Sequence, residues 1–237
     1  MLPNPRFARV YFRCQAFSVV ELLVIMVVVG VLVAIILPSL NKARLKANAA
    51  QCVDQFRELG AVFLKYSNDT EGNVIEATPA VNEGNPAWER TLKKYAEGQE
   101  SLRKDVKGFG FWRCPDCQQG HHGVGYNHFL GKLGFVEAIR KPSMTIVFGD
   151  AGIIRNPLQS DPDLWIEKKT VGNRGFNSGV FSVPASRNWR TSSQRMVNRH
   201  LGRSSVIFAD GHADSIPVSA VGFQYKAGDV RVLWDNQ

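Results

Sequence analysis

A polar, basic segment at the start of the chain gives way to a long run of apolar residues. Residues 17–37 are apolar apart from Ser18 and Glu21, and they are rich in valine and isoleucine. A helix of this length measures about 31 Å, close to the thickness of a bilayer's hydrocarbon core. Because a helix bonds its own backbone groups, the pattern predicts a transmembrane helix over residues 17–38.

Beyond Pro38 the pattern becomes one-sided. Apolar residues recur at alternating spacings of three and four, which predicts an amphipathic helix over residues 39–71; they are Leu45, Ala49, Cys52, Phe56, Leu59, Phe63 and Tyr66. Asn68-Asp69 and Gly72 supply a stop signal. Pro38 removes a backbone donor, so we expect a kink or local loosening there. Two helices broken at Pro38 are the alternative.

Residues 72–237 carry shorter signals and predict a globular domain. Trp88 to Tyr95 is typical of a short helix, and residues 156–163 and 172–178 are typical of loops. Short strands are expected at Phe109–Arg113, Thr145–Phe148, Leu164–Glu167, Gly179–Val183, Ser205–Ala209 and Val230–Trp234. The expected fold class is therefore α+β, with a small, mainly antiparallel sheet packed on the long N-terminal helix.

The basic residues favour a membrane topology rather than nucleic-acid binding. The formal net charge is +8, and three of the arginines stand before the apolar run, at positions 6, 9 and 13. They predict a cytoplasmic N-terminus and an extracytoplasmic globular domain, although Lys42, Arg44 and Lys46 weaken the asymmetry. The remaining excess forms no basic stripe interleaved with aromatics, so no nucleic-acid partner is expected.

Glu21 is the charge that a plain membrane anchor does not explain. A carboxylate near the start of a membrane helix is costly unless it meets a partner or lies at the headgroup level. A new N-terminal amine at Phe17 on a neighbouring subunit would supply that partner. A plain signal anchor remains an alternative, as does a signal peptide cut after Ala47-Asn48-Ala49, although its apolar region would normally be shorter.

The stretch Ala16-Phe17-Ser18-Val19-Val20-Glu21-Leu22-Leu23 resembles the processing signature of type IV pilins and pseudopilins. In that family a small residue, usually Gly, precedes a mature Phe, the fifth mature residue is Glu, and the twenty-second is commonly Pro. Counted from Phe17, Glu21 and Pro38 occupy those positions, whereas Ala16 departs from the usual Gly.

The resemblance implies that residues 1–16 are a leader removed by a prepilin peptidase, with N-methylation of Phe17. It implies roles in assembly for Glu21 and Pro38. It further implies an inner-membrane, single-pass subunit that meets membrane lipid, sibling pseudopilins and an inner-membrane assembly platform.

A second motif lies near the C-terminus. Asp210-Gly211 separates two extended runs and predicts a two-residue hairpin turn, and nine residues separate His200 from Asp210. With the prepilin-like start, this resembles a group of prepilin-like proteins that carry a C-terminal His, nine residues, Asp-Gly motif. Other features of that group correspond here to Cys114-Pro115, Tyr126-Asn127, Pro142-Ser143 and Asp150.

The cysteines admit two interpretations. Cys114 and Cys117, followed by His121 and His122, offer zinc-ligand types, but only half of most structural zinc patterns. Because Cys14 lies in the leader, three cysteines would remain, and an extracytoplasmic location favours a disulfide, for which we prefer Cys52 with Cys114. No metal site or other cofactor is expected.

We therefore expect a structural subunit of a type II secretion-like or type IV pilus-like filament and no enzymatic activity. A membrane-tethered module that binds polysaccharide or another exported substrate is the alternative, and exposed Trp88, Trp112, Trp165 or Trp189 would support it. A tethered hydrolase is a third hypothesis, and it requires His200 and Asp210 to converge. Otherwise we expect the His200 side chain to bond to its own hairpin.

Overall fold

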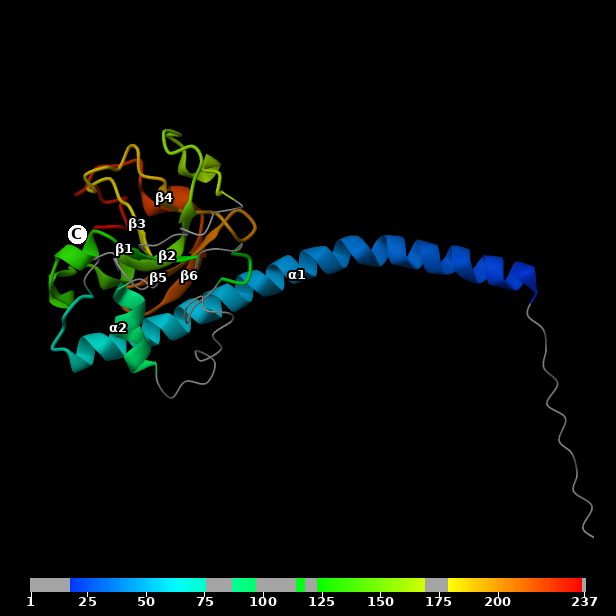
Figure 1. The fold of residues 1–237 in the computed structure, drawn as a ribbon, viewed down its shortest axis with the longest axis horizontal. Coiled ribbons are helices and arrows are strands. Elements are labelled where there is room, and N and C mark those ends of the chain that lie inside the picture. Colours follow the sequence, from blue (N-terminus) through cyan, green and yellow to red (C-terminus); the bar gives the residue numbers. More distant parts are fainter. Residues whose placement is uncertain (1–17, 76–86, 97–113, 118–122, 169–178, 236–237) are drawn as a thin grey trace, which may run out of the picture. The chain divides into compact units, whose positions relative to one another are not determined.

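The computed structural model describes residues 18–75, 87–96, 114–117, 123–168 and 179–235. The chain divides into two units, Met1–Ala43 and Arg44–Gln237. The first unit contributes the N-terminal half of helix α1 (Val19–Asp69), which continues through Pro38 into the second unit. The second unit holds the rest of α1, the short helix α2 (Ala87–Tyr95) and a small sheet (Figure 1). The predicted α+β class with one long N-terminal helix is confirmed.

Six strands form the sheet within the described residues: β1 (Val124–Asn127), β2 (Ile146–Ile153), β3 (Val180–Phe181), β4 (Gln194–Met196), β5 (Ser204–Phe208) and β6 (Ala213–Ile216). Their order is β3-β1-β2-β5-β6, and β4 also pairs with β2. Only the β1–β3 pair is parallel, and the other pairings of these strands are antiparallel. The long central strand β2 is buried almost throughout, because elements cover both of its faces.

Two hydrophobic layers lie on the two faces of the sheet. The first joins Phe56 and Phe63 of α1 and Trp88 of α2 to Phe148 and Ile207 of the sheet. The rings of Phe63 and Trp88 meet Phe148 edge-on, at centroid distances of 6.0 and 5.0 Å. Val206 and Phe208 flank Ile207 in the strand, and their side chains lie in the second layer, as strand alternation requires.

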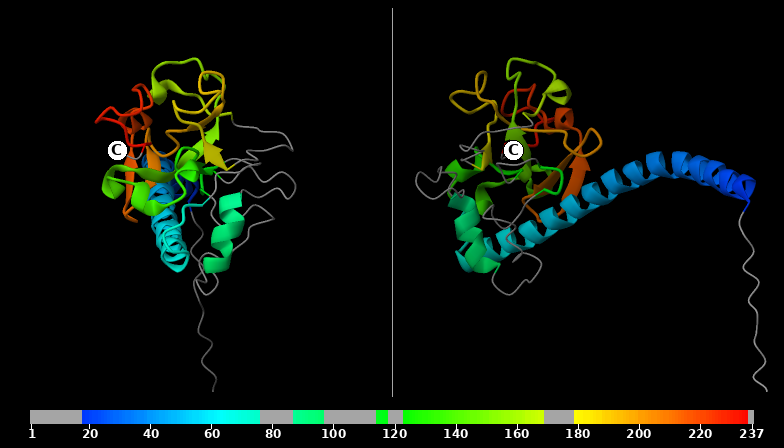
Figure 2. Two further views of the ribbon diagram at one scale, coloured as in Figure 1. Left: turned by 90° about the vertical axis from the view of Figure 1, so that its left-hand side faces the viewer. Right: turned by 45° about the vertical axis from the view of Figure 1, so that its right-hand side comes forward.

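The packed part of α1 follows the predicted stripe from Cys52 onward. Its buried residues are Cys52, Phe56, Leu59, Gly60, Val62, Phe63 and Ser67. Leu45, at the start of the predicted stripe, is 45% exposed. Helix α2 lies beside the C-terminal end of α1, where the rings of Tyr66 and Tyr95 are 5.2 Å apart (Figure 2).

The hairpin between β5 and β6 is confirmed, but its predicted turn is wrong. The N–H of Gly211 donates to the carbonyl of Phe208, and the N–H of Phe208 donates to the carbonyl of His212, so three residues lie between the bonded pair Phe208 and His212. Only Gly211 of that connection has a positive φ, of 91°. The two-residue turn lies instead at Leu201-Gly202, where both φ angles are positive (53° and 78°) and His200 pairs with Arg203.

The other predicted elements of the globular domain are confirmed only in part. The helix at Trp88–Tyr95 and strands overlapping Thr145–Phe148, Gly179–Val183 and Ser205–Ala209 are confirmed. The strand predicted at Leu164–Glu167 is reduced to a single antiparallel bridge between Glu167 and Ile154, because Leu164 ends a 3₁₀ helix (Pro162–Leu164). The strand predicted at residues 230–234 is wrong, since these residues form turns and bends that cap the second layer through buried Trp234. The strand expected at 109–113 and the loop at 172–178 lie outside the described residues.

The other 3₁₀ helices are short connectors. They are η2 (Leu130–Lys132), η3 (Val136–Ala138), η4 (Pro142–Met144) and η6 (Val218–Val221). The Pro142-Ser143 pair opens η4, where proline's fixed φ suits the first turn of a helix. Asn127 links the end of β1 to two distant segments, because its side-chain amide donates to the carbonyls of Ile146 and Trp234.

Candidate functional site

The N-terminal half of α1 exposes a continuous apolar surface. Its large apolar side chains between Val19 and Leu37 are 46 to 80% exposed. The helix contains a window with a mean hydropathy of 3.2, none of which is buried, so it is long and apolar enough to cross a membrane. Such a surface is unfavourable in water, and lipid or other apolar helices would cover it favourably.

Glu21 acts as a local cap in the isolated chain. The N–H of Ser18 donates to the Glu21 carboxylate (2.9 Å), while the Ser18 hydroxyl accepts from the N–H of Val20 (3.3 Å). This reciprocal arrangement is a capping box, and it stabilises the first turn of the helix. The predicted cleavage residues, Ala16 and Phe17, lie outside the described residues. The pairing of Glu21 with a neighbour's amine remains a prediction.

Four side chains that are distant in sequence meet in a buried cluster beneath the packed half of α1. Cys52 comes from α1, Cys114 opens a turn, Asp150 lies in β2, and His200 begins the hairpin turn before β5. One sulfur, nitrogen or oxygen atom from each lies within 4.8 Å of the others. All four residues are at most 2% exposed, so the cluster is shielded from water.

Short polar contacts join the four members. The Cys114 Sγ lies 3.1 Å from Nε2 of His200, and the Cys52 Sγ lies 3.6 Å from Oδ1 of Asp150. The His200 Nε2 is also 3.6 Å from Oδ2 of Asp150. Burying ionisable groups is costly unless they satisfy one another, so these contacts are what permits the cluster to sit in the core.

A surrounding set of donors and acceptors holds the cluster in place. Nδ1 of His200 lies 3.0 Å from the Asp116 carboxylate, whose other oxygen accepts from Asn48 of α1. The Asp150 carboxylate accepts from the Arg199 guanidinium (3.0 Å) and from the N–H of Ser205 (2.7 Å). The Arg199 side chain is only 3% exposed and also pairs with Glu167. Asp116 and Arg199, which contact the central side chains, are therefore held in place by contacts of their own.

The environment shifts the pKa values of all four groups. Burial raises the pKa of Asp150 to about 7, although Arg199 and His200 act against it. Burial alone would lower the pKa of His200, but the hydrogen bond with Cys114 and the charge of Asp150 raise it to about 9. Buried groups with opposed shifts gather at functional sites more often than elsewhere.

The two thiols shift in opposite directions. The hydrogen bond that Cys52 makes with Cys114, followed by burial, raises the pKa of Cys52. Burial also opposes ionisation of Cys114, but the bond from Cys52 and the charges of Arg199 and His200 outweigh it and lower the pKa of Cys114. Cys114 is therefore the sulfur that ionises first, and a thiolate is the form that binds metals and attacks disulfides.

The cysteine predictions have mixed outcomes. Cys52 and Cys114 are brought together, as the preferred pairing requires, yet both are free thiols in this structure, as is Cys117. The disulfide remains a prediction. Cys117 is buried and close to Cys114 in the same turn, but it is not one of the four clustered groups. His121 and His122 lie outside the described residues.

The two ends of the His200–Asp210 motif occupy different environments. Asp210 is exposed at the tip of the β5–β6 hairpin, where its carboxylate bonds to the backbone and ring of His212. His200 takes Cys114 and Asp116 as partners, so our expectation that its side chain bonds to the hairpin is wrong. The convergence of His200 and Asp210 that a hydrolytic pair needs is not observed.

Gly211 has a packing role. A Cβ at Gly211 would lie 2.5 Å from Leu64, and one at Gly60 would lie 2.2 Å from Ile207. Both distances are shorter than real contacts, so glycine at these two positions allows the hairpin to lie directly against α1. Glycine at position 211 is thus explained by its positive φ and by the close approach of the hairpin to the helix.

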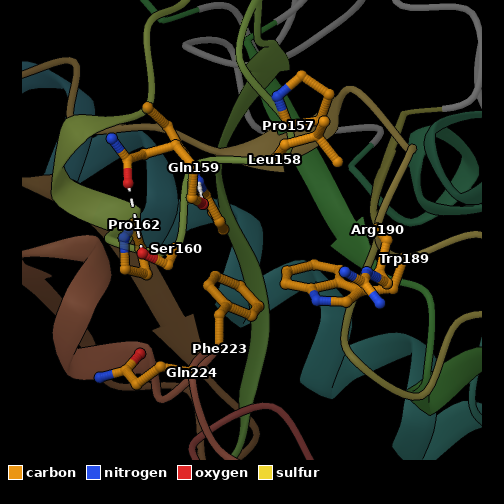
Figure 3. Close-up of a pocket in the computed structure, with 10 residues that line it drawn as sticks. Pro157, Leu158, Gln159, Ser160, Pro162, Trp189, Arg190, Phe223 and Gln224 are labelled. Carbon is orange, nitrogen blue, oxygen red and sulfur yellow. Dashed lines mark hydrogen bonds between the residues drawn. The ribbon is translucent and has the colours of Figure 1, made fainter.

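A pocket lined by aromatic side chains lies on the second hydrophobic layer and shares no residue with the buried cluster of Cys52, Cys114, Asp150 and His200. It has a volume of about 420 Å³ and is lined by Trp165, Trp189 and Phe223 together with the Pro157–Ser160 loop (Figure 3). The three rings pack at centroid distances of 5.4 to 5.9 Å. Arg195 lies over Trp189 at 3.5 Å. Trp189 is half-buried and is the aromatic side chain most available to a ligand there.

The other tryptophans give the binding hypothesis little support. Trp88 and Trp165 are 1% and 9% exposed. The indole N–H groups of Trp88 and Trp165 donate to the carbonyls of Gly179 and Gln159, respectively, as buried indoles usually do. Trp112 lies outside the described residues.

Comparison with known proteins adds no family assignment. No protein-family model matches the chain, and it has no significant match among curated proteins or solved structures.

Proposed function

We propose that this chain is a membrane-anchored, pilin-like structural subunit. The observation that carries the proposal is the division of α1. One half presents exposed apolar side chains all round, and the other half packs against a folded domain. A helix of this kind can insert among like helices while it carries its domain outside the membrane.

The sequence supports processing before assembly. The Ala16–Glu21 segment carries the offsets of a prepilin cleavage signal, and Glu21 follows the proposed new N-terminus by four residues. We infer that prepilin peptidase removes residues 1–16 and that Phe17 is methylated. The Glu21 carboxylate then exchanges its local partner, the N–H of Ser18, for the amine of a neighbouring subunit. Pro38 marks the end of the assembled apolar segment.

The proposed topology and partners follow. The apolar half of α1 crosses the inner membrane once, with the N-terminus in the cytoplasm and the globular domain outside it. Sibling subunits and an inner-membrane assembly platform are the partners during filament growth. Burial of apolar helices against each other drives assembly, so the proposed mechanism is not catalytic.

Cross-linking in cells tests the assembly step. In a host that retains the assembly system, brief formaldehyde treatment should trap multimers of the wild-type chain. Inactivation of the prepilin peptidase should reduce the chain to monomers, and Glu21→Gln should sharply reduce the multimers without changing the amount of membrane-bound protein. Wild-type monomers alone, or multimers unaffected by loss of the peptidase, would contradict the proposal.

The aromatic pocket favours one alternative function, a membrane-tethered binding module. We propose that a sugar ring would stack on Trp189, since sugars and aromatic faces are complementary and the pocket has room for one ring. Titration of soluble polysaccharide fragments against the detergent-solubilised chain, followed by tryptophan fluorescence, tests this alternative. A saturable change that is lost in Trp189→Ala would favour it, and no change up to millimolar sugar would remove it.

A further inference from the structure

The buried cluster contains the donor types that zinc prefers. Two cysteine sulfurs, one imidazole nitrogen and one carboxylate oxygen all approach one point, and their donor atoms lie within 4.8 Å of one another. Zinc in proteins is bound by these atom types, four at a time and tetrahedrally in structural sites. We propose that Cys52, Cys114, Asp150 and His200 bind one zinc ion.

The spacing of the donors agrees with that geometry. Zinc lies about 2.3 Å from sulfur and about 2.0 to 2.2 Å from nitrogen or oxygen, so the edges of the tetrahedron measure about 3.3 to 3.8 Å. Asp150 contacts Cys52 through Oδ1 and His200 through Oδ2, both at 3.6 Å, and the Cys114 sulfur lies 3.1 Å from Nε2 of His200. With one donor atom taken from each residue, all four lie within 4.8 Å of one another, about 1 Å wider than the longest edge of the tetrahedron. The four donors need only small movements to take up an ion.

The groups around the donors form the outer shell that a zinc site requires. A zinc-bound histidine ordinarily donates its second ring N–H to a carboxylate, which orients the ring. Nδ1 of His200 meets the Asp116 carboxylate at 3.0 Å, and that carboxylate is held in turn by Asn48. Donors from Arg199 and Ser205 likewise hold the Asp150 carboxylate. Both non-sulfur ligands are therefore oriented before an ion arrives.

Charge balance also favours a divalent ion. Two thiolates, one carboxylate and neutral His200 carry three negative charges, and zinc reduces the total to one. The buried Arg199 guanidinium, 3.0 Å from Asp150, offsets part of the remaining negative charge, although it is shared with the partly exposed Glu167 at 2.6 Å. A divalent cation therefore lowers the unfavourable negative charge that the buried ligands would otherwise carry.

The site would be structural rather than catalytic. All four coordination positions are filled by protein atoms, which leaves none open for water or substrate. The ligands come from α1, the Cys114 turn, β2 and the β4–β5 turn. One ion would thus join the packed half of the long helix to the centre of the sheet. This inference concerns the folded domain alone and does not depend on assembly into a filament.

Metal analysis of the full-length chain tests the proposal. The chain is purified in detergent from cells grown with added zinc, and zinc is measured by inductively coupled plasma mass spectrometry. We expect about one zinc ion per chain, retained through dialysis because structural zinc binds tightly. Cys114→Ser and His200→Gln should each lose most of that zinc. Cys117→Ser is the matched control, since Cys117 is a buried cysteine of the same turn outside the proposed set, and it should keep the ion.

Cobalt provides a readout that needs no variant and so avoids misfolded mutants. After the wild-type chain is stripped with a chelator and reloaded with Co²⁺, we expect thiolate-to-cobalt charge-transfer absorption and the intense visible bands of tetrahedral cobalt. Alkylation of the native chain should spare Cys52 and Cys114 until the chelator is added.

Three results would overturn the proposal. One is wild-type protein that takes up no zinc and shows no thiolate–cobalt band. Another is a Cys114→Ser variant that retains a full equivalent of zinc. The third is a Cys52–Cys114 disulfide in the purified chain, detected as a linked peptide and as two alkyl groups that the denatured, metal-free chain accepts only after reduction, because oxidised cysteines cannot bind the ion.

Discussion

The two halves of α1 belong to one helix but face different surroundings. Between Val19 and Leu37 apolar side chains surround the helix and are exposed, whereas from Cys52 onward a single buried stripe faces the sheet. Gly30 and Gly60, one in each half, differ in the same way in the space around them. A Cβ at Gly30 would meet nothing within 4 Å, but one at Gly60 would collide with Ile207. The first half is therefore suited to a non-specific apolar environment, and the second to one particular partner surface.

The largest predicted effect concerns the exposed half. Val27→Arg combined with Val31→Arg should release a large fraction of the chain from the membrane, because two central arginines cost about 5 to 7 kcal/mol of insertion free energy. That cost is similar to the total that the surrounding apolar residues supply. Carbonate extraction of membranes measures it, with Val27→Leu plus Val31→Leu as the control. Full membrane retention of the double arginine variant would contradict a transmembrane role.

Truncating one apolar side chain in each half should sharpen the contrast. Phe56→Ala should lower the free energy of unfolding of the globular domain by about 3 to 5 kcal/mol, since Phe56 is fully buried in the first layer. Leu32→Ala, in the exposed half, should change it by less than about 0.5 kcal/mol. Urea unfolding in detergent, followed through the buried Trp88 and Trp234, provides the measurement. Equal effects of the two variants would show that the halves are not energetically distinct.

Replacing Gly30 or Gly60 by alanine should have smaller effects on stability, and the two effects should have opposite signs. Alanine is a better helix former than glycine by about 1 kcal/mol, so Gly30→Ala should leave the folded domain unchanged and stabilise the helix slightly. Gly60→Ala should destabilise the domain by about 1 to 3 kcal/mol, because its Cβ would overlap Ile207. Adding Ile207→Val removes the colliding Cδ1 and should recover part of the loss. A neutral or stabilising Gly60→Ala would mean that the hairpin does not lie directly on α1.

The smallest predicted effect lies in the packed unit away from α1. Burial alone would raise the pKa of Asp163, but hydrogen bonds from Ser219 and Asn198 outweigh it and hold the pKa below its usual value. A carboxylate of this kind stabilises the fold above its unfolded pKa, and the benefit is lost as the pH falls through the lower folded pKa. Because Asp163 is exposed and solvent screens its charge, Asp163→Ala should therefore cost only about 0.5 kcal/mol at pH 7. That difference should shrink in acid, as urea unfolding at several pH values would show, whereas a pH-independent difference would exclude this role.

Much of the fold could be predicted from local patterns. The membrane-length run, the stripe on α1, the short helix at Trp88 and the β5–β6 hairpin all follow from periodicity or turn chemistry. The strands that the pattern misses have specific causes. Gly125 interrupts the apolar sequence pattern of β1, although it pairs within the strand, and a Cβ there would lie 2.6 Å from Ala151. β4 carries the charge of Arg195, whose buried guanidinium lies over Trp189 and donates to the carbonyls of Gln194 and Trp189.

The buried cluster could be predicted only in part. Cys52, Cys114, Asp150 and His200 each stand out in the sequence, but 86 to 98 residues separate the members of its sulfur contacts. Nothing in their spacing places His200 with Cys114 and Asp116 rather than with Asp210. The pairing follows from the Leu201-Gly202 turn, which sets His200 opposite Arg203 just before β5, and from the burial of Cys52 on the helix stripe. Such long-range geometry has no local signal.

Intact-mass analysis of the membrane-extracted chain tests the central claim most directly. The chain is produced together with an active prepilin peptidase and, in parallel, with its inactive mutant. The account predicts loss of residues 1–16 and the gain of one methyl group only with the active enzyme. A full-length, unmethylated chain in both cases would contradict the pilin-like pathway and leave α1 as a simple membrane anchor.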